Sequence, residues 1–146
     1  MAATLESHFG CVVFHEEDAV ETADAGAVRV VLADGKAVGF LSGGRPALTV
    51  RGAIAYRPTR RFVTVDMGAV RFVYNGADVM APGIVEADPA VAVGDLVWIR
   101  DERNRRPLAV GEALMTGPEM NVAEKGKAVR SLHHVGDDLW KIDEPA

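Results

Sequence analysis

Hydrophobic positions in the first sixty residues predict a β-hairpin. β-Branched and small apolar residues run from Ala27 to Ala33 and again from Lys36 to Leu41, and Asp34-Gly35 separates the two runs. A two-residue type I′ turn requires positive φ at both central positions, which Asp-Gly adopts readily. We therefore expect two antiparallel strands joined by Asp34-Gly35.

The segments on either side of this hairpin carry weaker patterns. Asp18 to Ala25 places Ala, Glu and Asp at helical spacing, which predicts a helix that stops at Gly26. Ala47 to Tyr56 predicts a strand that is interrupted at Gly52.

A basic segment that contains a proline, Arg57-Pro58-Thr59-Arg60-Arg61, follows these elements. Such a segment is typical of a joint between structural units. We expect a small N-terminal α/β domain over residues 1–60 and a second domain over residues 61–146. A chain of 146 residues is long enough for one compact domain or for two small ones that share an interface.

Beyond the joint, the pattern predicts a strand followed by a short capped helix. Phe62 to Val65 reads as the strand, and the Asp66 carboxylate can accept a hydrogen bond from the free N–H groups of a following helical turn. Met67 to Tyr74 places apolar residues along one face of a helix. The helix is expected to end at Asn75-Gly76, where glycine adopts the left-handed conformation.

Short strand-like segments separated by Gly and Pro turns fill the rest of the chain. This pattern is typical of a small β-barrel, so the expected fold class is α+β. The predicted strands are Val79 to Val85, Leu96 to Arg100, Leu108 to Met115 and Ala128 to Val135, with a return at Leu139 to Ile142.

The net charge restricts any nucleic-acid site to a local patch. The formal charge is −5 and the pI is about 5.3. From Arg61 onward, ten Lys and Arg residues stand against fourteen Asp and Glu residues, a net charge of −4. This balance argues against a broadly basic nucleic-acid surface.

Other compositional features point to a folded cytoplasmic protein without a membrane partner. No apolar run approaches the ~20 residues that span a bilayer, and the first residues lack the pattern of a secretory signal. The single cysteine, Cys11, has no second cysteine for an internal disulfide and is expected to be a small core residue.

Residues 66–85 carry the most specific motif of the chain, Asp-Met-Gly-Ala-Val-Arg-Phe-Val-Tyr-Asn-Gly-Ala-Asp-Val-Met-Ala-Pro-Gly-Ile-Val. This segment closely resembles the signature of the PUA family, which is Gly-Ala, a short helix, a second Gly-Ala, and an apolar pair before Pro-Gly. The resemblance continues in order over about 85 residues, through Val93-Gly94-Asp95-Leu96-Val97 and Leu108-Ala109-Val110-Gly111 to Leu139-Trp140.

The resemblance implies a C-terminal PUA pseudo-β-barrel after the small N-terminal domain. The layout is similar to that of archaeal pre-PUA/PUA proteins and of the malignant T-cell-amplified translation re-initiation factor family. It is also similar to the C-terminal region of archaeosine tRNA-guanine transglycosylase. We therefore expect the chain to bind structured RNA, with tRNA as the expected RNA.

The resemblance further implies that RNA lies along the helix of Met67 to Tyr74 and the strand after it. Glycines without Cβ atoms allow a sugar–phosphate chain to approach the main chain, although taken singly they would serve only turns and caps. Arg71 is a candidate for phosphate and Asn75 for sugar or base edges, while Arg71 fits a solvated helix face equally well. The positions that match the motif are Gly68, Ala69, Gly76, Ala77, Met80, Pro82 and Gly83.

Basic clusters elsewhere compete to extend this site. We favour Lys125 and Lys127, ahead of the cluster Arg57, Arg60 and Arg61 at the joint. Arg103, Arg105 and Arg106 share a turn with Asp101 and Glu102, so a locally neutralised loop is expected there. Trp98 and Trp140 are expected in the core, although either ring could stack on a base.

The densest set of acid–base or metal-capable side chains is His133, His134, Asp137 and Asp138. Adjacent residues of a strand point to opposite faces, so the two histidines cannot easily share one ion. No phosphate-binding loop, dinucleotide fingerprint or nucleophile motif occurs. We expect no metal, no cofactor and no catalysis.

Three functions remain open on the sequence. The leading one is an RNA-binding protein of translation or tRNA metabolism, whose N-terminal domain meets the ribosome or a translation factor. The second is a non-catalytic subunit of an RNA-modifying enzyme. The third is a protein-interaction module without RNA affinity, which the acidic balance favours.

Overall fold

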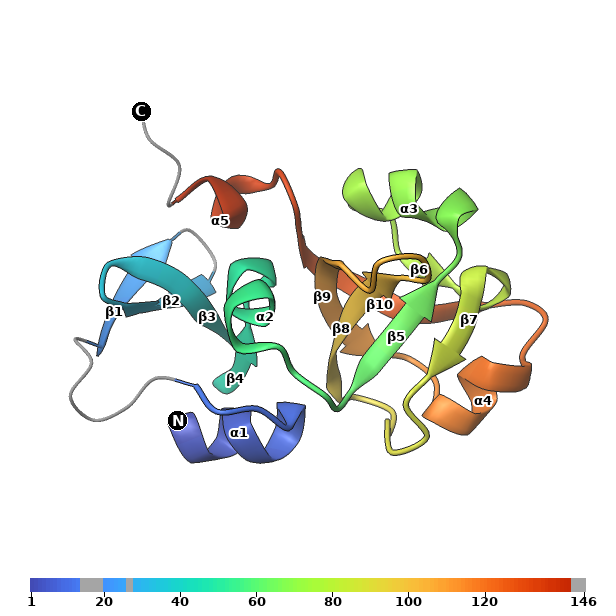
Figure 1. The fold of residues 1–146 in the computed structure, drawn as a ribbon, viewed down its shortest axis with the longest axis horizontal. Coiled ribbons are helices and arrows are strands. Elements are labelled where there is room, and N and C mark those ends of the chain that lie inside the picture. Colours follow the sequence, from blue (N-terminus) through green and yellow to red (C-terminus); the bar gives the residue numbers. More distant parts are fainter. Residues whose placement is uncertain (14–19, 26–27, 143–146) are drawn as a thin grey trace.

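The computed structural model describes residues 1–13, 20–25 and 28–142, which contain two β-sheets joined by a short segment (Figure 1). The N-terminal sheet has four strands in sequence order, and each pairs antiparallel with the next. Helix α2 lies between the two sheets and contacts both (Figure 1). The strands of the first sheet are β1 (Val20–Ala25), β2 (Val28–Ala33), β3 (Lys36–Ser42) and β4 (Arg45–Leu48).

The predicted hairpin is confirmed as β2 and β3. Ala33 pairs with Lys36 across the turn. The two turn residues, Asp34 and Gly35, have φ values of 51° and 80°. These positive angles are those of the expected type I′ turn.

The helix predicted for Asp18 to Ala25 is wrong over residues 20–25, which form β1; residues 18, 19 and 26 lie outside the described residues. Val20 pairs with Ala33 and Ala25 pairs with Val28, so β1 runs along the whole of β2. A helix of so few residues is marginal on its own, whereas a neighbouring strand provides a ladder of hydrogen bonds.

The strand predicted for Ala47 to Tyr56 is only half correct, because α2 (Val50–Tyr56) follows β4. The Thr49 hydroxyl accepts a hydrogen bond from the Gly52 N–H at 2.9 Å and caps the helix. Gly52 allows the helix to contact β3, since a Cβ there would lie 1.9 Å from the Val38 carbonyl oxygen. The interruption expected at Gly52 is therefore a close packing contact and not a break in a strand.

Three further helices were not predicted. α1 (Ala2–Phe9) buries Leu5 and Phe9, and α4 (Gly117–Val122) begins with a capping box between Thr116 and Glu119. α5 (Asp138–Lys141) replaces the strand return expected at Leu139 to Ile142. The reason is the Asp137 cap, whose carboxylate accepts from the Trp140 N–H at 2.9 Å and closes a helical turn.

The C-terminal sheet has six strands, and its two edge strands are joined by only a three-residue 3-10 turn, η1 (Ala81–Gly83). Because that turn connects opposite edges, the sheet curls into a nearly closed barrel. The small β-barrel and the α+β fold class expected from the sequence are therefore confirmed. β5 and β8 are parallel and the other pairs are antiparallel. In spatial order the strands are β6 (Val79–Met80), β10 (Lys127–His134), β9 (Pro107–Ala113), β8 (Leu96–Asp101), β5 (Phe62–Val65) and β7 (Ile84–Ala87).

Most strands of this sheet match their predicted segments, but the single strand expected over Val79 to Val85 is divided between β6 and β7. Pro82 in η1 has no N–H to continue a ladder, so the chain turns there. The predicted helix α3 (Met67–Tyr74) is confirmed: Asp66 accepts from the Ala69 N–H at 2.8 Å, and Gly76 has φ of 84°. α3 lies over one face of the barrel (Figure 1).

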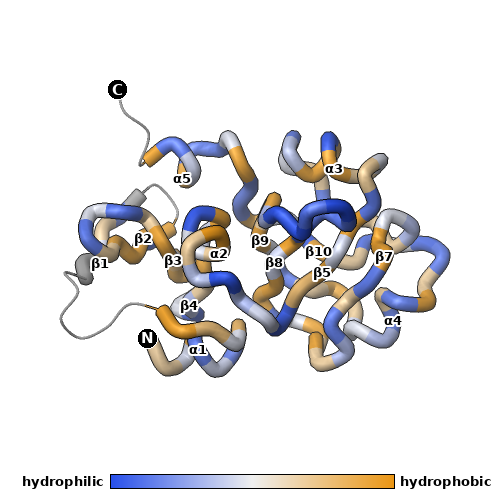
Figure 2. The backbone as a smooth tube through the Cα atoms, viewed as in Figure 1, coloured by the Kyte–Doolittle hydropathy of each residue, from blue (hydrophilic) through white to orange (hydrophobic). Residues whose placement is uncertain are grey.

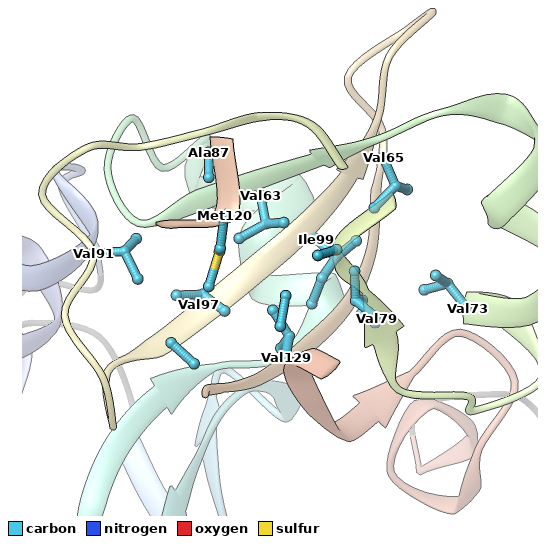
Figure 3. Packing of buried hydrophobic residues seen from close by; sticks show 14 of the residues in the cluster. Val63, Val65, Val73, Val79, Ala87, Val91, Val97, Ile99, Met120 and Val129 are labelled. Atoms are coloured by element: carbon cyan, nitrogen blue, oxygen red, sulfur yellow. The ribbon is translucent and has the colours of Figure 1, made fainter. Parts of the chain in front are cut away.

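The described residues form two hydrophobic clusters, of which the second joins the two sheets. Valine side chains from several strands, with Ile99 and Met120, fill the barrel interior (Figure 3). The second cluster takes Phe9 and Phe40 from the N-terminal part and Trp98 and Val110 from the barrel. Hydrophobic stretches accordingly follow β3, β8 and β9, toward the middle of the molecule (Figure 2).

The boundary expected at residue 61 falls in the segment between α2 and β5 and stays a prediction, because the second cluster crosses it. Cys11 is partly buried against this cluster, and Trp98 is buried within it. Among the described residues, no helix has both the length and the hydropathy needed to span a bilayer.

Candidate nucleic-acid interface

An open groove of about 510 Å³ runs between α3 and the segment from Ala77 to Gly83, and we name it the α3 groove. It brings together most of the residues that the sequence motif singles out. The predicted residues that line it are Gly68, Ala69, Ala77, Met80, Pro82 and Gly83, and the other lining residues are Asp66, Phe72, Val73, Asp78 and Val79.

Small residues keep this groove open where its walls meet. The Asp66 N–H donates to the Gly83 carbonyl at 2.9 Å, which holds the start of α3 against η1. A Cβ on Gly83 would lie 3.2 Å from the Ala69 side chain. A larger residue at Gly83 would therefore push α3 away or fill the groove.

Phe72 is the exposed aromatic residue among the lining residues that the sequence reasoning missed. Its side chain is 55% exposed, and Met80 in the same groove is 47% exposed. An exposed aromatic ring offers a surface for a base or a sugar. The sequence offered one signal for this site: Phe72 is a large aromatic residue that follows Arg71, outside the set of apolar positions expected to face the core.

The favoured lysines lie along one edge of the α3 groove. Lys127 is directly opposite Met80 in the β10–β6 pairing. The carbonyl of Gly126 accepts a hydrogen bond from the Ala81 N–H at 2.8 Å, so the Lys125-to-Lys127 segment is tied to the groove wall. Both lysines are exposed.

Asp78 reduces the positive charge at this edge. Its carboxylate lies 3.3 Å from the Lys127 ammonium group and accepts from the Ser131 N–H at 2.9 Å. The hydrogen bond from Ser131, together with Lys127, lowers the pKa of Asp78 despite some burial. Asp78 is therefore ionised at neutral pH, and an incoming phosphate has to compete with it for Lys127.

The remaining predicted residues lie around the end of α3. Arg71 is exposed, with its guanidinium 5.1 Å from the centre of the Phe72 ring. Asn75 is the C-terminal cap of the helix. Gly76 faces away from the groove, because a Cβ there would lie 2.9 Å from the His134 ring. Gly76 thus serves the turn and the packing against His134.

The cluster at the joint is divided by the fold. Arg61 pairs with Asp95 at 3.1 Å, and Arg60 donates to the Ser7 carbonyl at 3.2 Å, so both hold the chain in place. Arg57 lies apart from them, in a cavity that it shares with Arg105 and Arg106. None of these arginines lines the α3 groove.

His133 is a structural histidine and does not form a site with His134. His133 is 1% exposed, and its Nε2 accepts from the Val50 N–H at 3.1 Å. The proton therefore sits on Nδ1, which donates to Asp137 at 2.9 Å. His134 instead donates from Nδ1 to the Val135 carbonyl.

The Asp137 carboxylate accepts hydrogen bonds from the His133 ring and from two backbone N–H groups. Burial raises its pKa, but hydrogen bonds from His133 and from the Trp140 and His134 N–H groups outweigh burial and lower the pKa to about 2. In the described part of the chain, no group of three or more His, Cys, Asp or Glu residues is placed to hold a metal ion.

Comparisons with known proteins agree with this geometry. A translation machinery-associated protein 20 of Saccharomyces cerevisiae is 38% identical over 86 residues, which are 55% of this chain and 48% of the yeast protein. A malignant T-cell-amplified sequence 1 protein of Rattus norvegicus is 33% identical over 53% of this chain and 44% of its own length. The chain thus matches only about half the length of these relatives.

Archaeal proteins match over more of the chain. An uncharacterized protein of Methanocaldococcus jannaschii is 42% identical over 84% of this chain and 76% of its own. A solved structure of a conserved PUA domain protein from Thermoplasma acidophilum is 31% identical, with a TM-score of 0.79, and the alignment covers 91% of this chain and 85% of that one. The PUA domain family model itself matches residues 61–135. The chain, with its α3 groove and its nearly closed barrel, therefore belongs to the PUA family.

Proposed function

We propose that this protein binds structured RNA, with tRNA as the RNA class, through the α3 groove. The family and the names of its translation-associated relatives support an RNA-related role. The observation that carries the proposal is the convergence of the small motif residues with the exposed Phe72 on one open groove.

The chemistry of the groove suits the end of an RNA strand. Gly68, Ala69 and Gly83 leave the main chain accessible to a sugar–phosphate backbone. Phe72 and Met80 provide apolar contact for a sugar or a base. Lys127 at the edge and Arg71 on α3 provide charge for phosphates.

The test is tRNA binding by the full chain, measured by fluorescence anisotropy over a series of salt concentrations. Arg71→Glu with Lys127→Glu should weaken binding by at least about tenfold and make it less dependent on salt, because two phosphate contacts are lost. The matched control is Arg29→Glu with Lys36→Glu, which makes the same charge change on the N-terminal sheet. If both pairs weaken binding equally, only the net charge matters and the α3 groove is not the site.

A second candidate function is a protein-interaction module. The observation that favours it is that Asp66 and Asp78 line the groove beside exposed apolar side chains, which suits a basic, apolar peptide. Absence of tRNA binding at low salt by the unmodified chain would favour this function over RNA binding.

We also propose that the chain catalyses no reaction on the RNA. His133, which pairs with Asp137 in an arrangement that resembles catalytic machinery, is buried and has both ring nitrogens engaged. Purified protein should leave tRNA intact and unmodified, as measured by mass spectrometry of nucleosides, and chelators should not change its thermal stability. Modified nucleosides that appear in tRNA without any added enzyme would contradict this proposal.

A further inference from the structure

A cavity of about 650 Å³ lies where α2, the end of α3, the β8–β9 turn and α5 meet, and we name it the joint cavity. Its polar and aromatic lining comes from segments far apart in the chain. The residues that matter here are Arg57, Tyr74, Trp98, Arg105, Arg106 and Trp140.

We propose that the joint cavity binds one nucleotide of single-stranded RNA, with its phosphate on the three arginines and its base against Tyr74 and Trp140. This inference rests on the proposed function in that the nucleotide belongs to the same RNA. The size is suitable, since pockets for small ligands span about 300–1,000 Å³.

The lining of the joint cavity is positively charged. Three arginines line the joint cavity and, among the described residues, no carboxylate does, although the whole chain carries a net charge of −5. The α3 groove has the opposite balance, because Asp66 and Asp78 line it. A phosphate would therefore meet a more favourable potential in the joint cavity.

Within residues 1–13, 20–25 and 28–142, none of the three arginines forms an ion pair. Asp101, the last residue of β8, is buried and accepts from the N–H groups of Asn104 at 2.6 Å and Arg106 at 3.3 Å. It builds the turn and does not form an ion pair with Arg105 or Arg106. The locally neutralised loop that the sequence predicted therefore does not involve an ion pair at these two guanidinium groups within the described residues.

Two of the arginines in the joint cavity have a left-handed backbone conformation. Arg57 has φ of 52° and Arg105 has φ of 55°, in the left-handed region that costs a non-glycine residue about 1 kcal/mol. At Arg57 the backbone only closes α2, with its N–H donating to the Ala53 carbonyl at 3.0 Å. Glycine would make that cap at lower cost, so the turn does not explain the arginine side chain.

Aromatic side chains line the joint cavity, and α3 connects it to the α3 groove. Tyr74 and Trp140 are partly exposed, with the Arg51 guanidinium 3.7 Å from the centre of the Trp140 ring. Trp98 is almost fully buried and leaves these two rings as the contacts for a base. Tyr74 lines the joint cavity from the same helix whose residues Ala69 and Phe72 line the α3 groove. One RNA strand that passes the end of α3 can therefore reach both sites.

The chain contains two tryptophans, and both line the joint cavity while neither lines the α3 groove. Tryptophan fluorescence therefore reports on the surroundings of this cavity and not on the α3 groove. The probe is a hexauridylate added to the full chain. We expect saturable quenching that weakens as salt rises, because a base stacks on the partly exposed Trp140 and phosphates release counterions.

Arg57→Gly is the decisive variant. It replaces a residue that is strained at positive φ with glycine, so the protein should melt at the same temperature as wild type or higher. It also removes a guanidinium group, so the affinity for hexauridylate should fall about tenfold. Arg105→Ala with Arg106→Ala should lower the affinity further and reduce the salt dependence. Arg103→Ala, in the same turn but outside the cavity lining, should leave the affinity unchanged.

The outcomes separate this inference from the function proposed above. Absence of quenching, or equal quenching of wild type and both arginine variants, overturns the joint cavity as a nucleotide site, whether or not tRNA binds. Quenching that is retained in Arg71→Glu with Lys127→Glu supports the joint cavity independently. If that variant also keeps full tRNA affinity, the α3 groove proposal fails while the joint cavity stands.

Discussion

At the scale of single residues, the His133–Asp137 pair connects three elements. His133 on β10 accepts a hydrogen bond from the first residue of α2, and Asp137 caps α5. The tautomer follows from geometry alone, because a backbone N–H can only donate and Nε2 must therefore accept. Two residues that suggested a catalytic or metal site in the sequence instead hold the N-terminal part against the barrel.

The Asp137 carboxylate should make stability depend on pH in acid. Its folded pKa of about 2 lies below the ordinary value of 3.8, so the ionised group stabilises the fold above that ordinary value. This contribution, about 2 kcal/mol, should disappear as the pH falls from about 4 to about 2.

Asp137→Asn should therefore reduce the free energy of unfolding at pH 7 by about 2 kcal/mol and leave a smaller difference from wild type near pH 2. Urea titrations of both proteins at several pH values measure this. Asp138→Asn, an exposed neighbour, is the control. A difference that stays constant down to pH 2 would mean that the charge of Asp137 contributes nothing.

At the scale of elements, α2 depends on a contact that is distant in sequence. Thr49 caps the helix locally, and its hydroxyl also donates to the Ala37 carbonyl of β3 at 2.8 Å. Gly52, in the first turn of the helix, lies against the backbone of Val38. The close approach of helix and strand is what places Arg57, at the end of α2, beside the barrel.

Gly52→Ala should separate α2 from β3 despite the higher helix propensity of alanine. The new Cβ would lie 1.9 Å from the Val38 carbonyl oxygen, a backbone atom that cannot move alone. We expect a loss of about 3 kcal/mol in the free energy of unfolding, measured by urea denaturation. Ile54→Ala, at an exposed position of the same helix, should have little effect. Equal stability of Gly52→Ala and wild type would show that the contact does not exist.

At the scale of the whole molecule, the two sheets share one of the two cores. Phe9 and Phe40 pack with Trp98 and Val110, and α2 lies between the sheets. Separating residues 1–60 from the rest would expose this cluster to water. The N-terminal part therefore covers apolar residues of the barrel, and it is also a candidate surface for a partner.

We expect the full chain to unfold in a single cooperative transition. The second cluster couples the sheets, so neither should melt alone. Urea unfolding followed by tryptophan fluorescence reports the interface, and far-ultraviolet circular dichroism reports all elements. The two curves should coincide, whereas separate midpoints would show two independently folding domains with a boundary near residue 61.

The sequence by itself determined the features that depend on a few neighbouring residues. The Asp34-Gly35 hairpin, the Asp66 cap of α3 and the turn at Gly76 follow from local hydrogen bonds and positive φ angles, which act within one turn of chain. The motif residues of the α3 groove come from a single stretch of sequence, so their proximity could be predicted too.

Only the tertiary structure decided which distant segments meet. Residues 20–25 became a strand because β2 was beside them, and α2 formed where Gly52 could approach β3. Arg57 and Arg105 share the joint cavity, and Asp78 pairs with Lys127, although each pair is separated by more than forty residues. Electrostatic interactions act through space and depend on which segments the fold brings together. A chain that is acidic overall can therefore hold three arginines in a cavity that no carboxylate of the described residues lines, and the local sequence does not reveal this cluster.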